Sequence, residues 1–299
     1  MTLYSTILCA IDFSDHSRRA LRLALAIATR QRARVVAVHA VDPLLAEAAA
    51  TLSPGRSLEP DALSELNDLI AAERTNMASA PAVTTIVRVG PPAEVILDVA
   101  QENDAGLIAM GTQGLGGLRK LFFGSIAERV LRDAHVPAVA VPLPDDGDAA
   151  GVPRIHEVIA AVEMDHTAEA VADHAATVAE SLGLPLVLLH VVAPVHGAPR
   201  TAEAAAEATR LHEAGAQARL SELAARAAAV TSGKPVSAEV RYGPAAEEIA
   251  GAAATRQALV TIASGGNDGH HRPGSIAYRV LCLCDLPVLA VPTRHSARG

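Results

Sequence analysis

The sequence repeats itself at an offset of about 150 residues, and this repeat limits what the chain can fold into. Four segments of the first half return in the same order in the second half. The matching pairs are residues 38–41 with 189–192, 88–94 with 241–247, 124–131 with 274–281, and 136–142 with 286–292. A unit of this length is too long for a solenoid repeat, so each copy is expected to be a domain. We expect domains at residues 1–143 and 154–294, joined by an acidic, turn-rich linker at 142–153.

Within one copy, short apolar runs alternate with stretches of helical periodicity. The runs at 7–11, 35–39, 84–89, 107–110 and 138–141 are typical of strands buried on both faces. Helices are expected after the first run, over 60–79, from 91–92, and over 125–134, with either Ser14 or Ser17 capping the first of them. This alternation predicts an α/β fold with a doubly wound parallel sheet, in which ligands bind at the carboxyl ends of the strands.

Composition excludes several classes of protein. The 299 residues include 25 basic and 33 acidic side chains, a net charge of −8, so nucleic acid is not an expected partner. Half of the residues are hydrophobic, which excludes wholesale disorder. Three cysteines cannot form a disulfide framework, and no apolar run approaches the roughly 18 residues of a membrane span. Because the N-terminus also lacks the basic region of a signal peptide, we expect a cytoplasmic protein that does not enter a membrane.

A glycine-rich stretch follows the fourth strand of the first copy and precedes a helix. It runs from Gly111 through Gly114 to Gly124-Ser125. Glycine lets backbone N–H groups approach an anion, and a helix N-terminus favours phosphate. Arg119 and Lys120 lie within the stretch and could meet a terminal phosphate. The alternative is a flexible surface loop; neither the P-loop nor the dinucleotide fingerprint is present.

Asp12 ends the first strand of the first copy. If that strand lies beside the fourth, the carboxylate points into the same crevice as Gly111. A carboxylate repels phosphate, so it would accept a hydrogen bond from an adenine amine or a ribose hydroxyl. The alternative is that Asp12 only caps the following turn.

These residues resemble those of a known family. The spacing Gly111-x2-Gly114-x9-Gly124-Ser125 is similar to the ATP-binding signature of the universal stress proteins, as are residues 10–14 and 136–141. The resemblance covers both halves of the chain. It implies two tandem domains, each with a five-stranded parallel sheet in the order 3-2-1-4-5 flanked by helices.

The resemblance also implies a set of ATP-binding residues in the first copy. By the family pattern, the side chain of Asp12 and the backbone at Ala10 and Ala40 hold the adenosine, and a second group passes under the ribose and phosphates. A third group holds the phosphate chain, often with a divalent cation such as Mg²⁺. The second group is Met110, Gly111, Gln113 and Gly114, and the third is Gly124, Ser125 and Ile126. Family members commonly dimerise through their last strands, and a tandem chain could satisfy that pairing internally. The sequence does not decide whether two chains also form a homodimer.

The second copy departs from the signature. From Gly111 to Gly124 is 13 positions, whereas from Gly265 to Gly274 is 9, and Asp268 replaces the second glycine. Glu163 stands where the first copy has Asp12. We expect this copy to bind nucleotide weakly or not at all, or to hold another ligand, with Gly274-Ser275 as a remaining candidate anion site. The alternative is a degenerate copy kept for packing. A zinc site is not expected there, although Asp268, His270 and His271 with either Cys282 or Cys284 would be its candidate ligands.

The function expected from these features is that of an ATP-binding regulatory protein of the stress response, acting on an unidentified protein partner. One alternative is a slow ATPase, for which the sequence shows no convincing water-activating base. The other is an interaction module that binds no nucleotide.

Overall fold

The computed structural model describes residues 3–53, 55, 57–75, 77, 79–113, 124–143, 151–192, 202–264 and 275–293, without the side chains of 202–212. The chain divides into two compact units, Met1–Arg154 and Ile155–Gly299. Several residues singled out from the sequence lie outside the described residues: Gly114, Arg119, Lys120, Asp268, His270 and His271.

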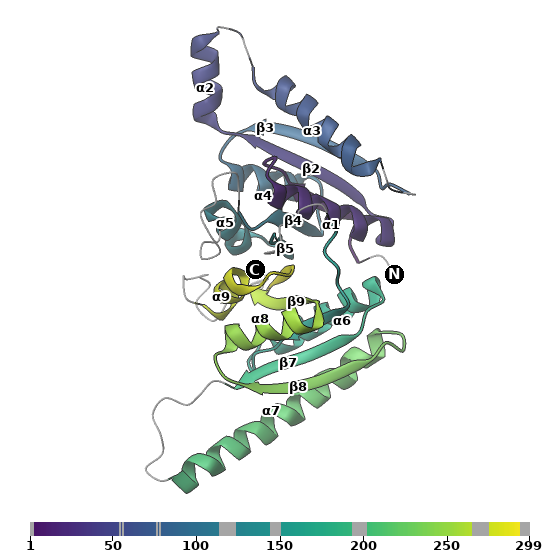
Figure 1. The fold of residues 1–299 in the computed structure, drawn as a ribbon, viewed down its shortest axis with the longest axis vertical. Coiled ribbons are helices and arrows are strands. Elements are labelled where there is room, and N and C mark those ends of the chain that lie inside the picture. The colour runs from purple at the N-terminus through teal and green to yellow at the C-terminus, as the bar shows by residue number, and fades with distance from the viewer. Residues whose placement is uncertain are drawn as a thin grey trace, which may run out of the picture. The chain divides into compact units, whose positions relative to one another are not determined.

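The first unit is built around a parallel sheet (Figure 1). Its strands are β1 (Thr6–Ala10), β2 (Arg34–Val41), β3 (Val83–Val89), β4 (Leu107–Gly111) and β5 (Ala138–Val141), and they lie in the order β3-β2-β1-β4-β5. In the register of the central strands, Ile7 of β1 pairs with Val35 of β2 and with Leu107 of β4. All three side chains are fully buried, as the continuous apolar runs predict.

Helices cover both faces of this sheet. They are α1 (Asp15–Gln31), α2 (Pro43–Leu52), α3 (Glu59–Arg74), α4 (Pro92–Glu102) and α5 (Ser125–Asp133). Right-handed crossovers place α1 and α3 on one face and α4 and α5 on the other, because the chain reverses its direction across the sheet after β3. A bidentate ion pair from Arg22 of α1 to Glu73 of α3, at 2.6 and 2.7 Å, joins the two helices of the first face.

Helix α1 begins at a serine cap. The backbone N–H of Ser17 donates to Oγ of Ser14, which settles which of the two expected serines is the cap. The apolar side of the helix, including Ala20, Leu21 and Ala24, is buried against the sheet.

One helix of the first unit, α2, is absent from the expectations above. It forms because Pro43 occupies its first turn and Asp42 caps it, accepting from the N–H of Leu44 at 2.7 Å. None of its residues is buried, so no amphipathic period marks it in the sequence. The next helix, α3, ends at Arg74 rather than at residue 79.

The second unit has the same topology. Its strands are β6 (Glu157–Ala161), β7 (Leu186–Val192), β8 (Val236–Tyr242), β9 (Ala258–Ser264) and β10 (Val288–Pro292), parallel and in the order β8-β7-β6-β9-β10. Its helices are α6 (Ala168–Leu182), α7 (Ala202–Val230), α8 (Ala245–Arg256) and α9 (Ile276–Leu283). The predicted α/β class is therefore confirmed. Among the helices in the described part of the chain, none combines the length and the apolar character needed to cross a membrane.

Candidate functional site

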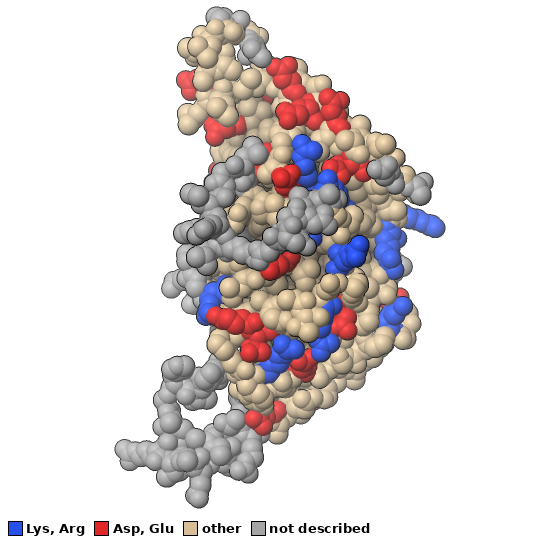
Figure 2. Space-filling view, in the orientation of Figure 1, with Lys and Arg blue, Asp and Glu red and all other residues tan. Residues whose placement is uncertain are grey.

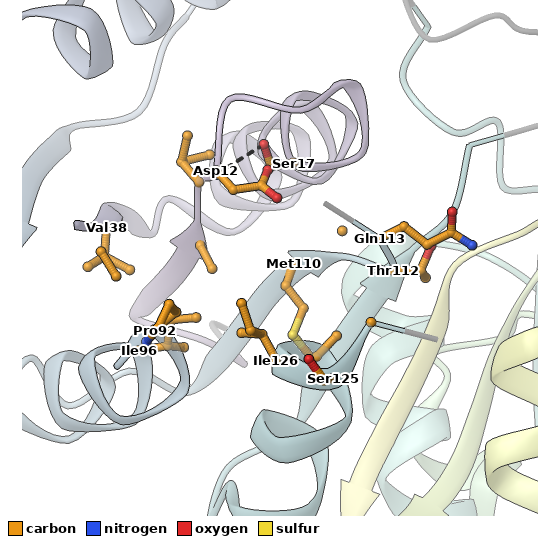
Figure 3. A pocket seen from close by; sticks show the side chains of 16 residues that line it. Asp12, Ser17, Val38, Pro92, Ile96, Met110, Thr112, Gln113, Ser125 and Ile126 are labelled. Carbon is orange, nitrogen blue, oxygen red and sulfur yellow. Dashed lines mark hydrogen bonds between the residues drawn. The ribbon is translucent and has the colours of Figure 1, made fainter. Parts of the chain in front are cut away.

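A cavity of about 240 Å³ lies at the carboxyl ends of β1, β2 and β4 in the first unit (Figure 3). The first turns of α4 and α5 complete its wall. The structure brings together on this wall nine of the residues singled out from the sequence: Ala10, Asp12, Ala40, Met110, Gly111, Gln113, Gly124, Ser125 and Ile126. The tenth, Gly114, lies outside the described residues.

The two ends of the cavity differ in chemistry. Val38, Pro92 and Ile96 lie together at one end, whereas Thr112 and Gln113 lie at the other (Figure 3). The apolar end suits a flat, weakly polar group such as a nucleobase, and the polar end suits a hydrated or charged group.

Asp12 has a role in the turn that leads into α1. Its Oδ1 accepts from the backbone N–H of Ser14 at 3.0 Å and from the hydroxyl of Ser14 at 2.5 Å. The backbone N–H of Asp12 lies 3.4 Å from Oγ of Ser17, which also faces the cavity (Figure 3). The turn-capping alternative for Asp12 is thus observed, and the carboxylate lines the cavity as well.

Gly111 is required by helix packing. A Cβ atom at this position would lie 2.6 Å from Cβ of His16 and 3.0 Å from the backbone nitrogen of Ser17. Helix α1 can therefore approach the end of β4 only because residue 111 has no side chain. The sequence predicts that this glycine lets an anion approach the backbone, and the packing of α1 is a second reason for a glycine here.

His16 is a residue near the site that sequence reasoning missed. Its Nδ1 lies 3.2 Å from Oγ1 of Thr112, which lines the cavity. Burial lowers the pKa of His16, against smaller opposing effects of Asp12 and Asp15. Nothing in the sequence marks this histidine, because only the packing of α1 on β4 brings it to Thr112.

Helix α5 begins at the cavity without a side-chain cap. Its N-cap is Gly124, and no side chain accepts a hydrogen bond from the first turn. The N–H of Gly124 donates to the carbonyl of Thr112 at 2.9 Å, which fixes the start of the helix beside β4. Ser125 is exposed. The N–H groups of such a turn and the helix dipole both favour an anion.

The matching cavity of the second unit is much smaller, at about 50 Å³. Glu163 and His190 line it, and burial raises the pKa of Glu163. The ring of His190 is held in place by an Nδ1–H that donates to the carbonyl of Val162 at 2.9 Å. Helix α9 has a side-chain cap: Oγ of its N-cap residue, Ser275, accepts a hydrogen bond from the N–H of Tyr278 at 3.2 Å. The serine side chain therefore occupies the position that an anion could take at α5.

Among the described residues, no three or more His, Cys, Asp or Glu side chains lie close enough together to hold a metal ion. Cys284 is buried at the end of α9, and burial raises the pKa of its thiol. Three of the residues considered for a zinc site, Asp268, His270 and His271, lie outside this part of the chain.

Comparison with known proteins finds one family in both halves. The profile described as the universal stress protein family matches residues 3–142 and 155–292. A universal stress protein of Thermus aquaticus is 36% identical over 145 residues, covering 46% of this chain and 99% of the relative. One from Methanocaldococcus jannaschii is 32% identical over 152 residues, covering 48% and 84%. The crystal structure of a universal stress protein from Archaeoglobus fulgidus, 17% identical, covers 96% of this chain and 98% of that one with a TM-score of 0.63, which is a likeness of fold.

Proposed function

The chain belongs to the universal stress protein family, with one copy of the family's domain in each half, and on this premise we propose that its first copy binds ATP. In this proposal the protein is a cytoplasmic regulator of the stress response, and nucleotide occupancy changes the surface that it offers to a protein partner. Such a change requires that ATP bind two conformations with different affinity.

The apolar end of the cavity would take the adenine. Val38, Pro92 and Ile96 offer contact area to a base, and Asp12 accepts hydrogen bonds but donates none when it is ionised. An acceptor at this place selects a base amine or a ribose hydroxyl. The backbone at Ala10 and Ala40, at the ends of β1 and β2, would hold the rest of the adenosine.

The phosphates would extend past Gly111 and Gln113 toward the first turn of α5. There the N–H groups after Gly124 and the hydroxyl of Ser125 can donate to phosphate oxygens. A Cβ atom at Gly124 would lie 3.2 Å from the carbonyl oxygen of Thr112, so the backbone is already close-packed where the chain turns into the helix. Mg²⁺ bound with ATP would be held mainly by the phosphates, with Ser125 as a candidate oxygen ligand.

The observation that carries the proposal is that one cavity joins an apolar pocket at β1 and β2 to the uncapped start of α5. Isothermal titration of the full chain with ATP and Mg²⁺ tests it. We expect one ATP per chain, bound in the first unit. No heat of binding, or equal binding of inorganic phosphate alone, would contradict the proposal.

We propose that the first copy binds ATP without hydrolysing it. Among the described residues that line the cavity, Asp12 is the one carboxylate, and no histidine or lysine joins it. Its Oδ1 is already held by Ser14, so it is poorly placed to activate water. Phosphate release above about one turnover per minute, lost in a Ser125→Ala variant, would instead favour the ATPase alternative.

A Ser125→Asp substitution separates binding from folding. An acidic residue in the first turn of α5 interacts favourably with the helix dipole, so the unfolding temperature should not fall. The same carboxylate would repel the phosphates, and we expect the Kd for ATP to rise about tenfold or more. Titration calorimetry and thermal unfolding of the same preparations measure both effects.

The second unit offers the matched control. Ser275→Asp places the same charge at the start of α9, where Asp is also a good N-cap, and it should leave ATP binding unchanged. If the two variants weaken ATP binding equally, the cavity of the first unit is not the binding site.

A further inference from the structure

Three arginines are exposed together at one end of the first unit. Arg30 lies in the last turn of α1, Arg32 caps that helix, and Arg34 begins β2. Figure 2 shows basic side chains on the side of this unit where α1 ends and β2 begins. None of the three forms an ion pair within the described part of the chain, although the protein as a whole has a net charge of −8. We call Arg30, Arg32 and Arg34 the arginine end.

One of these guanidinium groups is held in a fixed position. Nε of Arg34 donates to Oγ1 of Thr6 at 3.0 Å, and Nη2 donates to the carbonyl oxygen of Asn103 at 2.9 Å. Both acceptors are neutral, so the positive charge of Arg34 is oriented by the fold but is not neutralised by it.

Arg32 adopts a backbone conformation that normally favours glycine. Its φ of 56° and ψ of 36° lie in the left-handed region, where a side chain costs energy. The equivalent helix cap of the second unit is Gly183, at φ 63° and ψ 35°. The first unit therefore carries an arginine at a position where its own sister copy has the more stable choice.

The sister copy shows that the fold does not need these charges. The pairing of Ile7 with Val35 in the first unit corresponds to that of Val158 with Leu186 in the second. By this register, the arginine end corresponds to Ser181, Gly183 and Pro185. A basic side chain near the end of a helix stabilises its dipole, but α6 has none in its last turn and forms the same element.

We propose that the arginine end binds an acidic segment of a partner protein. A guanidinium group can bind a carboxylate through two parallel hydrogen bonds, so three arginines suit a short run of Asp and Glu side chains. Nucleic acid fits less well as a partner. Protein surfaces that bind nucleic acid carry a wider basic area than these three arginines, and a protein of net charge −8 repels a long polyanion. Asp104 follows Asn103 and would limit the acidic segment on that side.

The arginine end lies away from the proposed ATP cavity. Arg34 begins β2 and Ala40 lies near the carboxyl end of the same strand, so about 20 Å of strand separates the two. The two surfaces can therefore be occupied at the same time, and this proposal does not depend on ATP binding.

Fluorescence anisotropy with a labelled glutamate-rich peptide and the full chain tests the proposal. We expect binding that weakens with salt, and a twofold to fivefold higher Kd, as a rough estimate, for each of Arg30→Gln, Arg32→Gly and Arg34→Gln. Arg32→Gly should also raise the unfolding temperature by about 2 °C, because it relieves the backbone. Weaker binding in a more stable protein cannot come from damage to the fold.

Two further variants give the controls. Lys234→Gln removes one positive charge from an exposed turn of the second unit and should leave the affinity for the peptide unchanged. Asp104→Asn removes the neighbouring carboxylate and should improve it about twofold. Equal binding by the wild type and the triple arginine variant, or no binding by either, overturns the proposal. Tighter binding of single-stranded DNA of equal charge would overturn the choice of partner.

Discussion

Replacing Gly111 by alanine is expected to lower the free energy of unfolding of the first unit by about 3 kcal/mol. The new Cβ atom would lie 2.6 Å from Cβ of His16 and 2.8 Å from its carbonyl carbon. Neither of these atoms can be moved by rotating a side chain, so α1 would have to shift away from β4. ATP binding should be lost as well, because a shift of α1 away from β4 would distort the cavity that both elements line. Denaturant unfolding of the full chain, followed by calorimetry to separate the two units, measures the change.

Two other substitutions make this prediction specific. Combining Gly111→Ala with His16→Ala should not restore stability, because alanine keeps the Cβ atom that causes the clash. Gly251→Ala makes the same chemical change in the middle of α8, where a Cβ atom would meet nothing within 4 Å. That variant should be more stable than the wild type by up to about 1 kcal/mol. A Gly111→Ala protein as stable as the wild type would show that the packing argument is wrong.

This double role of Gly111 affects how a glycine signature is interpreted. A substitution there removes the close contact between α1 and β4 before any ligand is considered, so loss of ATP binding would not show that Gly111 touches phosphate. The Ser125→Asp variant is the better probe of the phosphates, since it changes charge at an exposed position without overpacking.

Much of the fold follows from the sequence because buried parallel strands are continuous apolar runs. The runs at 7–11 and 107–110 correspond to β1 (Thr6–Ala10) and β4 (Leu107–Gly111), which differ from them by one residue. Helix α2 could not be found in this way. It buries none of its side chains, so its only signals are local, namely the cap at Asp42 and the proline that follows it.

The sequence predicts which residues meet at this cavity, but not every contact that holds them there. Positions at the ends of β1 and β4 converge because the strands are parallel and adjacent, and this geometry brings Asp12 and Met110 to one cavity. The contact of His16 with Gly111 and Thr112 depends on the exact approach of α1, which no residue pattern encodes. The sequence also does not predict that Ser275 caps α9 while Ser125 does not cap α5, since the two serines occupy matching positions in the repeat.

Acidification is expected to destabilise the second unit through His174. This residue lies on α6, and burial lowers its pKa to about 4 from an ordinary value of 6.5. The folded state then binds fewer protons than the unfolded state between these two values. The contribution of His174 to stability should be constant above pH 6.5, fall as the pH drops toward 4, and level off below that, for a total loss of about 3 kcal/mol. Unfolding by urea at a series of pH values measures the loss.

The contribution of His174 must be separated from that of other groups in the same unit. Burial raises the pKa of Glu163, which makes the folded state take up a proton more readily and so opposes the effect of His174. The comparison is therefore between the wild type and His174→Gln, whose amide does not titrate. We expect the variant to lose most of the acid sensitivity, and His166→Gln, a change at an exposed histidine, to keep it. If the wild type and His174→Gln lose stability in parallel on acidification, the buried imidazole is not the cause, and the sensitivity comes from the carboxylates instead.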